Sequence, residues 1–205
     1  MTPVLRRGTS RVAPEAADLI LSAIPSLEFV LGDRATAVRA IESCYRAERT
    51  ELAYRFSLLA EVDHELSGIA IAFPGRLHGA LKLGTGVVMA RAAGARHVAE
   101  LAQRARVINR LLPNVDPHYL YVPTLSVAHD RRRQGIATAL MDRVITGADR
   151  LGLGVALDTA MGDEPARALY EKLGFRVISV HETSEDEKKM LPISGLVRLE
   201  RPAGL

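Results

Sequence analysis

Hydrophobic residues repeat along the chain with two different spacings, one typical of strands and one typical of helices. Short runs with strand spacing predict seven strands, at residues 4–7, 54–62, 66–73, 119–127, 154–159, 175–180 and 195–199. The second and third runs flank the polar turn 63–65, and we expect them to pair as a hairpin that ends at Pro74 and Gly75.

The helical segments begin and end at residues suited to those positions. Pro14 opens one segment, and Asp33 is placed to cap the next. Two further helices are expected at 134–151 and 163–173, the second with Pro165 in its first turn. Residues 76–117, rich in Ala and Arg, have helical spacing between two strands, and we interpret them as a helical insert. The pattern predicts a single domain over residues 1–205 that mixes helices and strands.

The composition narrows the class of protein. The chain has 205 residues, of which 48% are hydrophobic and 25% charged, with a net charge of +3. This content allows a buried core and argues against a disordered chain. The single cysteine, Cys44, excludes an intramolecular disulfide and a Cys-based zinc site. Together with an N-terminus that lacks an apolar signal, it leads us to expect a cytoplasmic protein without a membrane span.

Arginine supplies most of the positive charge, with 23 Arg against 4 Lys. The arginines are scattered, and only 4% of the residues are aromatic, so few rings are available to stack on bases. This distribution argues against a nucleic-acid-binding protein.

The strongest local signal lies between the strand at 119–127 and the helix that follows it. There the sequence Arg132-Arg133-Gln134-Gly135-Ile136-Ala137 places small residues at the start of a helix. A ligand can therefore approach the free N–H groups of the first turn, where the helix dipole favours an anion. Alternatively, Gly135 only permits a tight turn and the arginines form a solvated surface. The patterns of the dinucleotide and ATP loops are both absent, which favours a different pyrophosphate ligand.

A second block follows at residues 163–175, with Asp163, Ala166, Leu169, Tyr170, Gly174 and Phe175. In this order, the two blocks resemble the GNAT superfamily of acetyl-CoA-dependent N-acetyltransferases, whose motifs are [RQ]-x-x-G-x-[GA] and N-x-x-A-x-x-L-Y-x-x-x-G-F. The resemblance covers about residues 120–182. It implies an α/β (α+β) fold with a mixed, mostly antiparallel sheet that opens between strands 4 and 5, flanked by helices, with the helical insert between strands 3 and 4.

The resemblance also implies a cosubstrate, acetyl-CoA, and a binding site for it. The coenzyme's thioester and pantetheine would lie along the fourth strand, and its pyrophosphate at the loop that precedes the next helix. The residues implied for coenzyme binding are Leu125, Ser126, Val127, Arg132, Arg133, Gln134, Gly135, Ile136, Ala137, Asp163 and Ala166. Asp163 stands where the family often has Asn, and its charge would lie near the pyrophosphate, although it can still cap the helix.

Tyr170 is implied as the acid that protonates the departing thiolate. A phenol with the ordinary pKa of about 10 stays protonated at pH 7 and can donate that proton. Alternatively, Tyr170 only packs its ring beside neighbouring leucines and hydrogen-bonds its hydroxyl.

The general base, which takes a proton from the amine, is expected to be Asp158, on the strand before the Tyr170 helix. Similar members carry a Glu at this spacing. Alternatively, Asp158 pairs with an arginine or caps the end of its strand. Glu61 and Asp63 on the hairpin are the next candidates, and His118 and Tyr119 are placed to border the acceptor site.

The sequence therefore predicts an N-acetyltransferase that moves an acetyl group to a primary amine by direct attack, with no metal. Transfer of a different acyl group, or a non-catalytic acyl-CoA sensor with this fold, are the alternatives. The acceptor amine is not specified. The insert at 76–117 is expected to cover the acceptor pocket, to form a homodimer surface, or both. Its arginines either select an acidic acceptor or form a solvated face; they are Arg91, Arg96, Arg104, Arg106 and Arg110.

Overall fold

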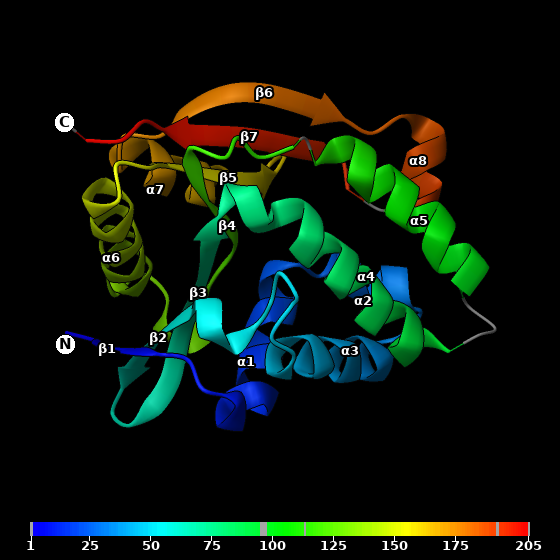
Figure 1. Cartoon of the computed structure of the whole chain (residues 1–205), viewed down its shortest axis with the longest axis horizontal. Helices are drawn as coiled ribbons and strands as arrows, with labels where there is room; N and C mark the ends of the chain where they lie inside the picture. Colours follow the sequence, from blue (N-terminus) through cyan, green and yellow to red (C-terminus); the bar gives the residue numbers. More distant parts are fainter. Residues whose placement is uncertain (1, 95–97, 113, 192, 205) are drawn as a thin grey trace.

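One seven-stranded sheet runs through the molecule (Figure 1). The computed structural model describes residues 2–94, 98–112, 114–191 and 193–204, so residues 95–97 and 113 of the insert, Arg96 among them, lie outside its description. The strands are β1 Val4–Arg7, β2 Ser57–Val62, β3 Glu65–Pro74, β4 Tyr119–Val127, β5 Gly154–Ala160, β6 Arg176–Glu182 and β7 Gly195–Arg201.

The helices follow the expected positions closely. They are α1 Ala13–Ala23, α2 Ser26–Leu31, α3 Arg34–Arg46, α4 His78–Ala93, α5 Val98–Leu111, α6 Ile136–Arg150, α7 Glu164–Lys172 and α8 Glu185–Met190. Short 3₁₀ turns are η1 Ser10–Val12, η2 Tyr54–Phe56, η3 Gly75–Leu77 and η5 His129–Arg131. The Asp33 carboxylate accepts a hydrogen bond from the Thr36 amide at 2.8 Å, which confirms it as the cap of α3.

Two boundaries and one additional helix differ most from the sequence-based expectation, and other element ends differ by one or two residues. Residues 54–56, expected at the start of a strand, form the turn η2, and β2 begins only at Ser57. The helix expected from Gln134 begins at Ile136, because Gly135 adopts a left-handed conformation that a helix cannot contain. Helix α8 was not predicted, although Ser184 and Glu187 form a capping box that is visible in the sequence.

The strands lie in the order β1-β2-β3-β4-β5-β7-β6, and each pair of neighbours is antiparallel except β4 and β5, which are parallel. This confirms the predicted mixed, mostly antiparallel sheet. Helices α1 to α5 pack on one face, around buried Ile69 and Ile71, whereas α6 and α7 pack on the other (Figure 1). The insert contributes α4 and α5, between β3 and β4, as predicted.

Strands β4 and β5 pair over only four residues each and then separate. The last pair is Val122 with Leu157, although β4 continues to Val127. Directly after it comes Pro123, which has no N–H to donate to a neighbouring strand. On the other side of β4 the register with β3 shifts: the step from Phe73 to Ile71 on β3 matches three residues on β4, so β4 carries one extra residue. Because a bulge bends its strand, β4 turns away from β5 at this point.

Two arginines of the insert are used inside the fold. Arg104 donates to the main-chain carbonyls of Phe29 and Val30, at the end of α2. Arg110 forms a bidentate ion pair with Glu187 of α8, with N–O distances of 2.6 and 2.5 Å. The pKa of the Glu187 carboxyl is thereby lowered to about 2. These contacts attach α5 to α2 and to α8, so neither arginine serves only as a solvated charge.

Candidate functional site

The loop that joins β4 to α6 leaves the first turn of that helix open to a ligand. Gly135 is the N-cap of α6, with φ of 80°, and it supplies no side chain to accept from the first-turn amides. A Cβ at Gly135 would meet no described atom within 4 Å. The amides of the first turn therefore have no side-chain cap, and the positive end of the helix dipole lies behind them, which is the arrangement that binds phosphate groups.

The three arginines of the loop differ in whether their side chains already have a partner in the fold. Arg131 lies 3.2 Å from carboxylate oxygens of both Asp63 and Glu65, so it ties the loop to the β2–β3 turn. Arg132 donates from Nε to the Val127 carbonyl at 3.3 Å. Arg133, with φ of 62°, is exposed and has no hydrogen-bond or ion-pair partner within the described part of the chain. Arg133, and the two terminal nitrogens of exposed Arg132, are thus available to a ligand at this loop.

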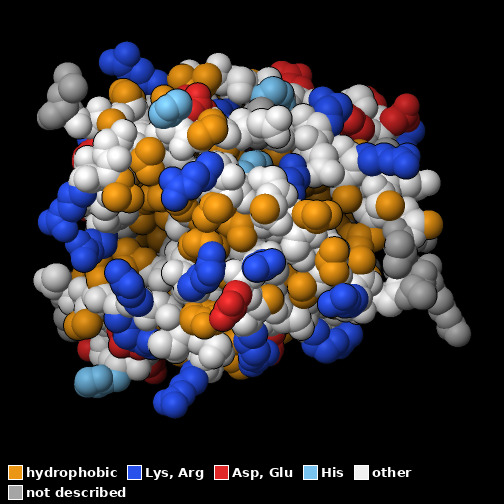
Figure 2. Space-filling model, in the orientation of Figure 1, with side chains coloured by type: hydrophobic (Ala, Val, Ile, Leu, Met, Phe, Trp, Pro, Cys, Tyr) orange, Lys and Arg blue, Asp and Glu red, His pale blue; other side chains and the backbone are white. Residues whose placement is uncertain are grey.

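The residues proposed from the sequence for the coenzyme lie along one path. Leu125 and Val127 of β4 pack toward the core cluster that contains α6 and α7. They lead directly into the loop with Gln134, which donates to the Asp130 carbonyl at 3.4 Å, and into α6 with buried Ile136 and half-buried Ala137. Figure 2 shows a hollow with hydrophobic side chains between α6 and the strands, while Lys and Arg side chains are scattered over this face.

Ser126 points to the opposite face of β4. Its hydroxyl lies 2.8 Å from the Ser22 hydroxyl at the end of α1. Its side chain therefore helps to hold α1 on the sheet, and only its main chain follows the path along β4.

Tyr170 and Asp163 lie on the same side of the sheet as this path. Tyr170 is 7% exposed, and its ring packs against Phe175 with centroids 5.8 Å apart. Burial, and to a smaller extent the negative charge of Asp163, raise the pKa of the Tyr170 phenol above its ordinary value. Its hydroxyl has no hydrogen-bond partner among the described residues, so the ring packs but the hydroxyl stays free to donate.

Asp163 caps α7. Its carboxylate accepts from the Ala166 amide at 3.1 Å, as the sequence allowed for a residue in place of the usual Asn. The carboxylate is thus occupied by the helix end.

Asp158 pairs with an arginine, the alternative to a role as base. Its two carboxylate oxygens accept from Nε and Nη2 of Arg198, at 2.8 and 2.9 Å. The Tyr121 hydroxyl also donates to it, at 2.8 Å. The side chains of Asp158 and Arg198 are only 5% and 3% exposed. This ion pair joins β5 to β7. Asp158 is the first residue of β5 that no longer pairs with β4.

The next candidates for the base, and the two residues expected to border the acceptor site, lie away from the separation of β4 and β5. Glu61 is bound to Arg6 at the β1 side of the sheet, and Asp63 is paired with Arg131. His118 lies 2.9 Å from Asp116, and Tyr119 is paired with Gly154, so both lie at the end where β4 and β5 are still joined.

Cys44 is fully buried in α3, and burial raises the pKa of its thiol to about 12. It is therefore a packing residue, as expected, because so little thiolate is present at neutral pH. Among the described residues, no group of three His, Cys, Asp or Glu side chains lies close enough together to hold a metal ion. Within the same residues, no helix is both long and apolar enough to cross a membrane.

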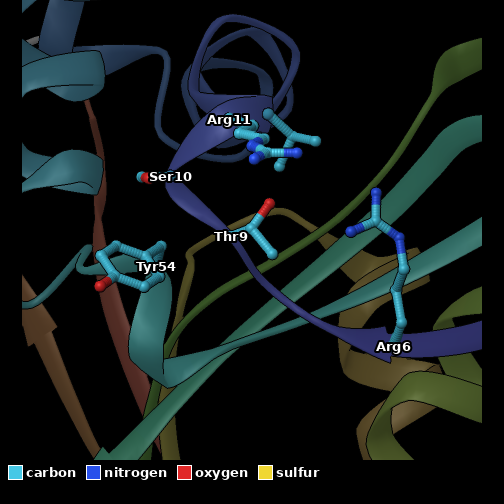
Figure 3. Close-up of a pocket in the computed structure, with 6 residues that line it drawn as sticks. Arg6, Thr9, Ser10, Arg11 and Tyr54 are labelled. Carbon is cyan, nitrogen blue, oxygen red and sulfur yellow. The ribbon is translucent and has the colours of Figure 1, made fainter.

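A second hollow lies at the edge of the sheet (Figure 3). Arg6 of β1 and Arg11 of η1 extend toward it beside Thr9, and Tyr54 borders it from η2. None of its lining residues belongs to β4, β5 or the loop before α6, so it is separate from the path described above.

Comparisons with known proteins agree with this geometry. The family model of the acetyltransferase (GNAT) family matches residues 31–175. A search of curated proteins found no match. Among solved structures, an N-acetyltransferase from Staphylococcus aureus Mu50 is 18% identical, with a TM-score of 0.75 over 96% of this chain and 99% of that one. An acetyltransferase from Bacillus subtilis in complex with CoA is 17% identical, with a TM-score of 0.56 over 99% of both chains. At these identities the likeness concerns the fold.

The Asp158–Arg198 pair generates a prediction on stability. Replacing Arg198 by Met leaves the Asp158 carboxylate buried without its counter-ion, which typically costs about 3–5 kcal/mol of unfolding free energy. Urea unfolding should show this loss, and the double variant Arg198→Met/Asp158→Asn should recover much of it. A single variant as stable as the wild type would contradict the prediction.

Proposed function

The chain belongs to the acetyltransferase (GNAT) family, and we propose that it moves an acetyl group from acetyl-CoA to a primary amine within a ternary complex. The observation that carries the proposal is the open first turn of α6 at Gly135, at the end of a strand that has left its neighbour. Pyrophosphate would bind the helix amides, and pantetheine would bind the main chain of β4 from Leu125 to Val127. The acceptor is a small amine or an amine of a peptide or protein.

In the proposed reaction the amine nitrogen attacks the thioester carbonyl carbon. A nitrogen–carbon bond forms, the carbon–sulfur bond breaks, and the thiolate takes the proton of the Tyr170 hydroxyl. Burial raises the pKa of the Tyr170 phenol, which keeps it protonated at neutral pH but also makes it a weaker acid toward the thiolate. The amine must also lose a proton, which passes to water, and water then returns a proton to the Tyr170 phenolate. Holding both reactants in place contributes most of the acceleration, since the transfer then occurs within one complex.

Asp158 remains our candidate for the carboxylate at the reacting centre, but its contacts favour positioning over proton transfer. A carboxylate that accepts two hydrogen bonds from a guanidinium and one from a phenol is a poor base toward an amine. We propose that Asp158, through its ion pair with Arg198, holds β5 in place against β7 at the point where β5 stops pairing with β4. If Asp158 is instead the base, Asp158→Asn should remove the low-pH limb of the rate profile rather than only lower stability.

Coenzyme binding can be tested with one variant and one matched control. Acetyl-CoA at 100 times its dissociation constant should stabilise the fold by about 2.7 kcal/mol, which a thermal-shift assay detects. Gly135→Glu should abolish the shift, because it places bulk and negative charge where the phosphates bind. Gly152, at the other end of α6, has φ of 65° and equally open surroundings. Gly152→Glu therefore carries similar backbone strain and should keep the shift; equal loss in both variants would point to strain instead.

The role of Tyr170 separates an enzyme from a non-catalytic acyl-CoA sensor. Tyr170→Phe removes one proton donor and little volume, so turnover should fall about 10²–10⁴-fold while acetyl-CoA affinity changes little. Steady-state kinetics and direct binding measurements check both halves. Undiminished turnover would remove Tyr170 from the mechanism. Binding with no turnover in the wild type, across amines, peptides and several acyl-CoAs, would favour the sensor.

We also propose a homodimer that forms through the insert. On α4, Leu83 and Val87 are 71% and 44% exposed, and they border an apolar groove beside the segment after α3. Exposed hydrophobic side chains that adjoin one another, as these two do along the groove, are typical of a surface that binds a partner. Light scattering at micromolar concentration should give the mass of a dimer, and Leu83→Glu should give a monomer. A wild-type monomer under these conditions would contradict the proposal.

A further inference from the structure

After Val122, where β4 stops pairing with β5, the side chains of β4 point alternately to the two faces of the sheet. Leu125 and Val127 pack toward the cluster of α6 and α7, on the proposed coenzyme side. Ser126 contacts Ser22 of α1, on the opposite side. Because side chains alternate along a strand, Thr124 lies on the same face as Ser126. On this face the Tyr121 hydroxyl and the Asp158 carboxylate also meet.

Thr124 lies on this face, and its hydroxyl makes no hydrogen bond to the described residues. The residue is 1% exposed. A buried hydroxyl without a partner is unfavourable, and native structures contain few such groups. Valine has nearly the same shape and would fill the position without this cost. The fold itself therefore gives no reason for a hydroxyl at position 124.

Ser126 provides the contrast on the same strand and face. It is also buried, at 6% exposed, but its hydroxyl has the Ser22 hydroxyl as partner at 2.8 Å. The two hydroxyls thus differ in one respect: that of Ser126 is satisfied within the chain, and that of Thr124 is not. Thr124 is also nearer to the point of separation, since only Pro123 stands between it and the last residue of β4 paired with β5.

If the thioester binds where β4 and β5 separate, the amine that attacks it can supply the hydrogen-bond partner that Thr124 lacks. With the coenzyme on the α6 side, an attacking amine must reach the planar carbonyl from the other side, which is the face of Thr124. An amine nitrogen carries N–H donors that need an acceptor once water is excluded. A threonine oxygen can accept such a bond in addition to donating its own proton.

Building on the proposed function, we infer that the Thr124 hydroxyl binds the acceptor amine, accepting a hydrogen bond from the nitrogen that attacks the thioester. Thr124 is then a residue for acceptor binding and orientation, separate from the coenzyme site. It favours acceptors that keep an N–H directed to β4 during attack, which primary amines do.

The first test measures stability and needs no ligand. Thr124→Val should unfold at the same temperature as the wild type or higher, because it removes an unpaired buried hydroxyl and keeps the volume. Ser22→Ala is the matched control: it leaves the Ser126 hydroxyl without its partner and should lower the melting temperature. A clear loss of stability in Thr124→Val would show that the hydroxyl already has a partner in the folded chain, and would overturn the inference.

The second test uses a probe that contains both substrates, coenzyme A whose sulfur carries a CH₂–C(O)–NH–butyl group. Its amide N–H takes the place of the acceptor N–H. By calorimetry, Thr124→Val should bind the conjugate about three- to tenfold more weakly than the wild type, the usual effect of one neutral hydrogen bond. Its affinity for coenzyme A alone should be unchanged.

The outcomes distinguish this inference from the proposed function. If the wild type and Thr124→Val bind the conjugate equally while both bind coenzyme A, the role of Thr124 is wrong and the coenzyme site stands. If the wild type binds neither compound, the coenzyme site is wrong and the inference falls with it. Weaker binding of both compounds by Thr124→Val would place Thr124 in the coenzyme site and would also overturn the inference.

Discussion

The separation of β4 from β5 after Val122 and Leu157 is the constraint on which the rest of the site depends. An extra residue in β4 and a proline without an N–H end the pairing on one side. On the other side, the buried Asp158–Arg198 pair holds β5 to β7. The sheet therefore opens in its middle without losing its order, and main-chain groups of β4 become available within a folded core.

The two faces of the opened strand are built for different tasks. The face toward α6 and α7 is apolar and leads into the open helix end at Gly135, which suits a long ligand with a phosphate at one end. On the opposite face β4 carries the hydroxyls of Thr124 and Ser126, and the Tyr121–Asp158 hydrogen bond lies on the same face of the sheet. The proposed coenzyme and acceptor sites thus differ in chemistry because successive side chains of one strand point in opposite directions.

Local chemistry explains which features could be predicted from the sequence. The turn at Gly135 and the cap at Asp163 depend on neighbouring residues only, and both are found where the motifs indicated. The partner of Asp158 could not be identified, because Arg198 lies 40 residues away and meets it only through the order of the strands. The unpaired Thr124 hydroxyl was missed for the same reason: the lack of a partner is a property of packing, and no local pattern shows it.

Hydrogen exchange of the main-chain amides, with and without coenzyme A, tests most directly whether the opened strand and the end of α6 form the ligand site. Binding should slow exchange in peptides that cover residues 124–137 and leave residues 4–12, which border the hollow of Figure 3, unchanged. Protection at residues 4–12, with none between 124 and 137, would contradict the assignment and move the coenzyme to the edge of the sheet.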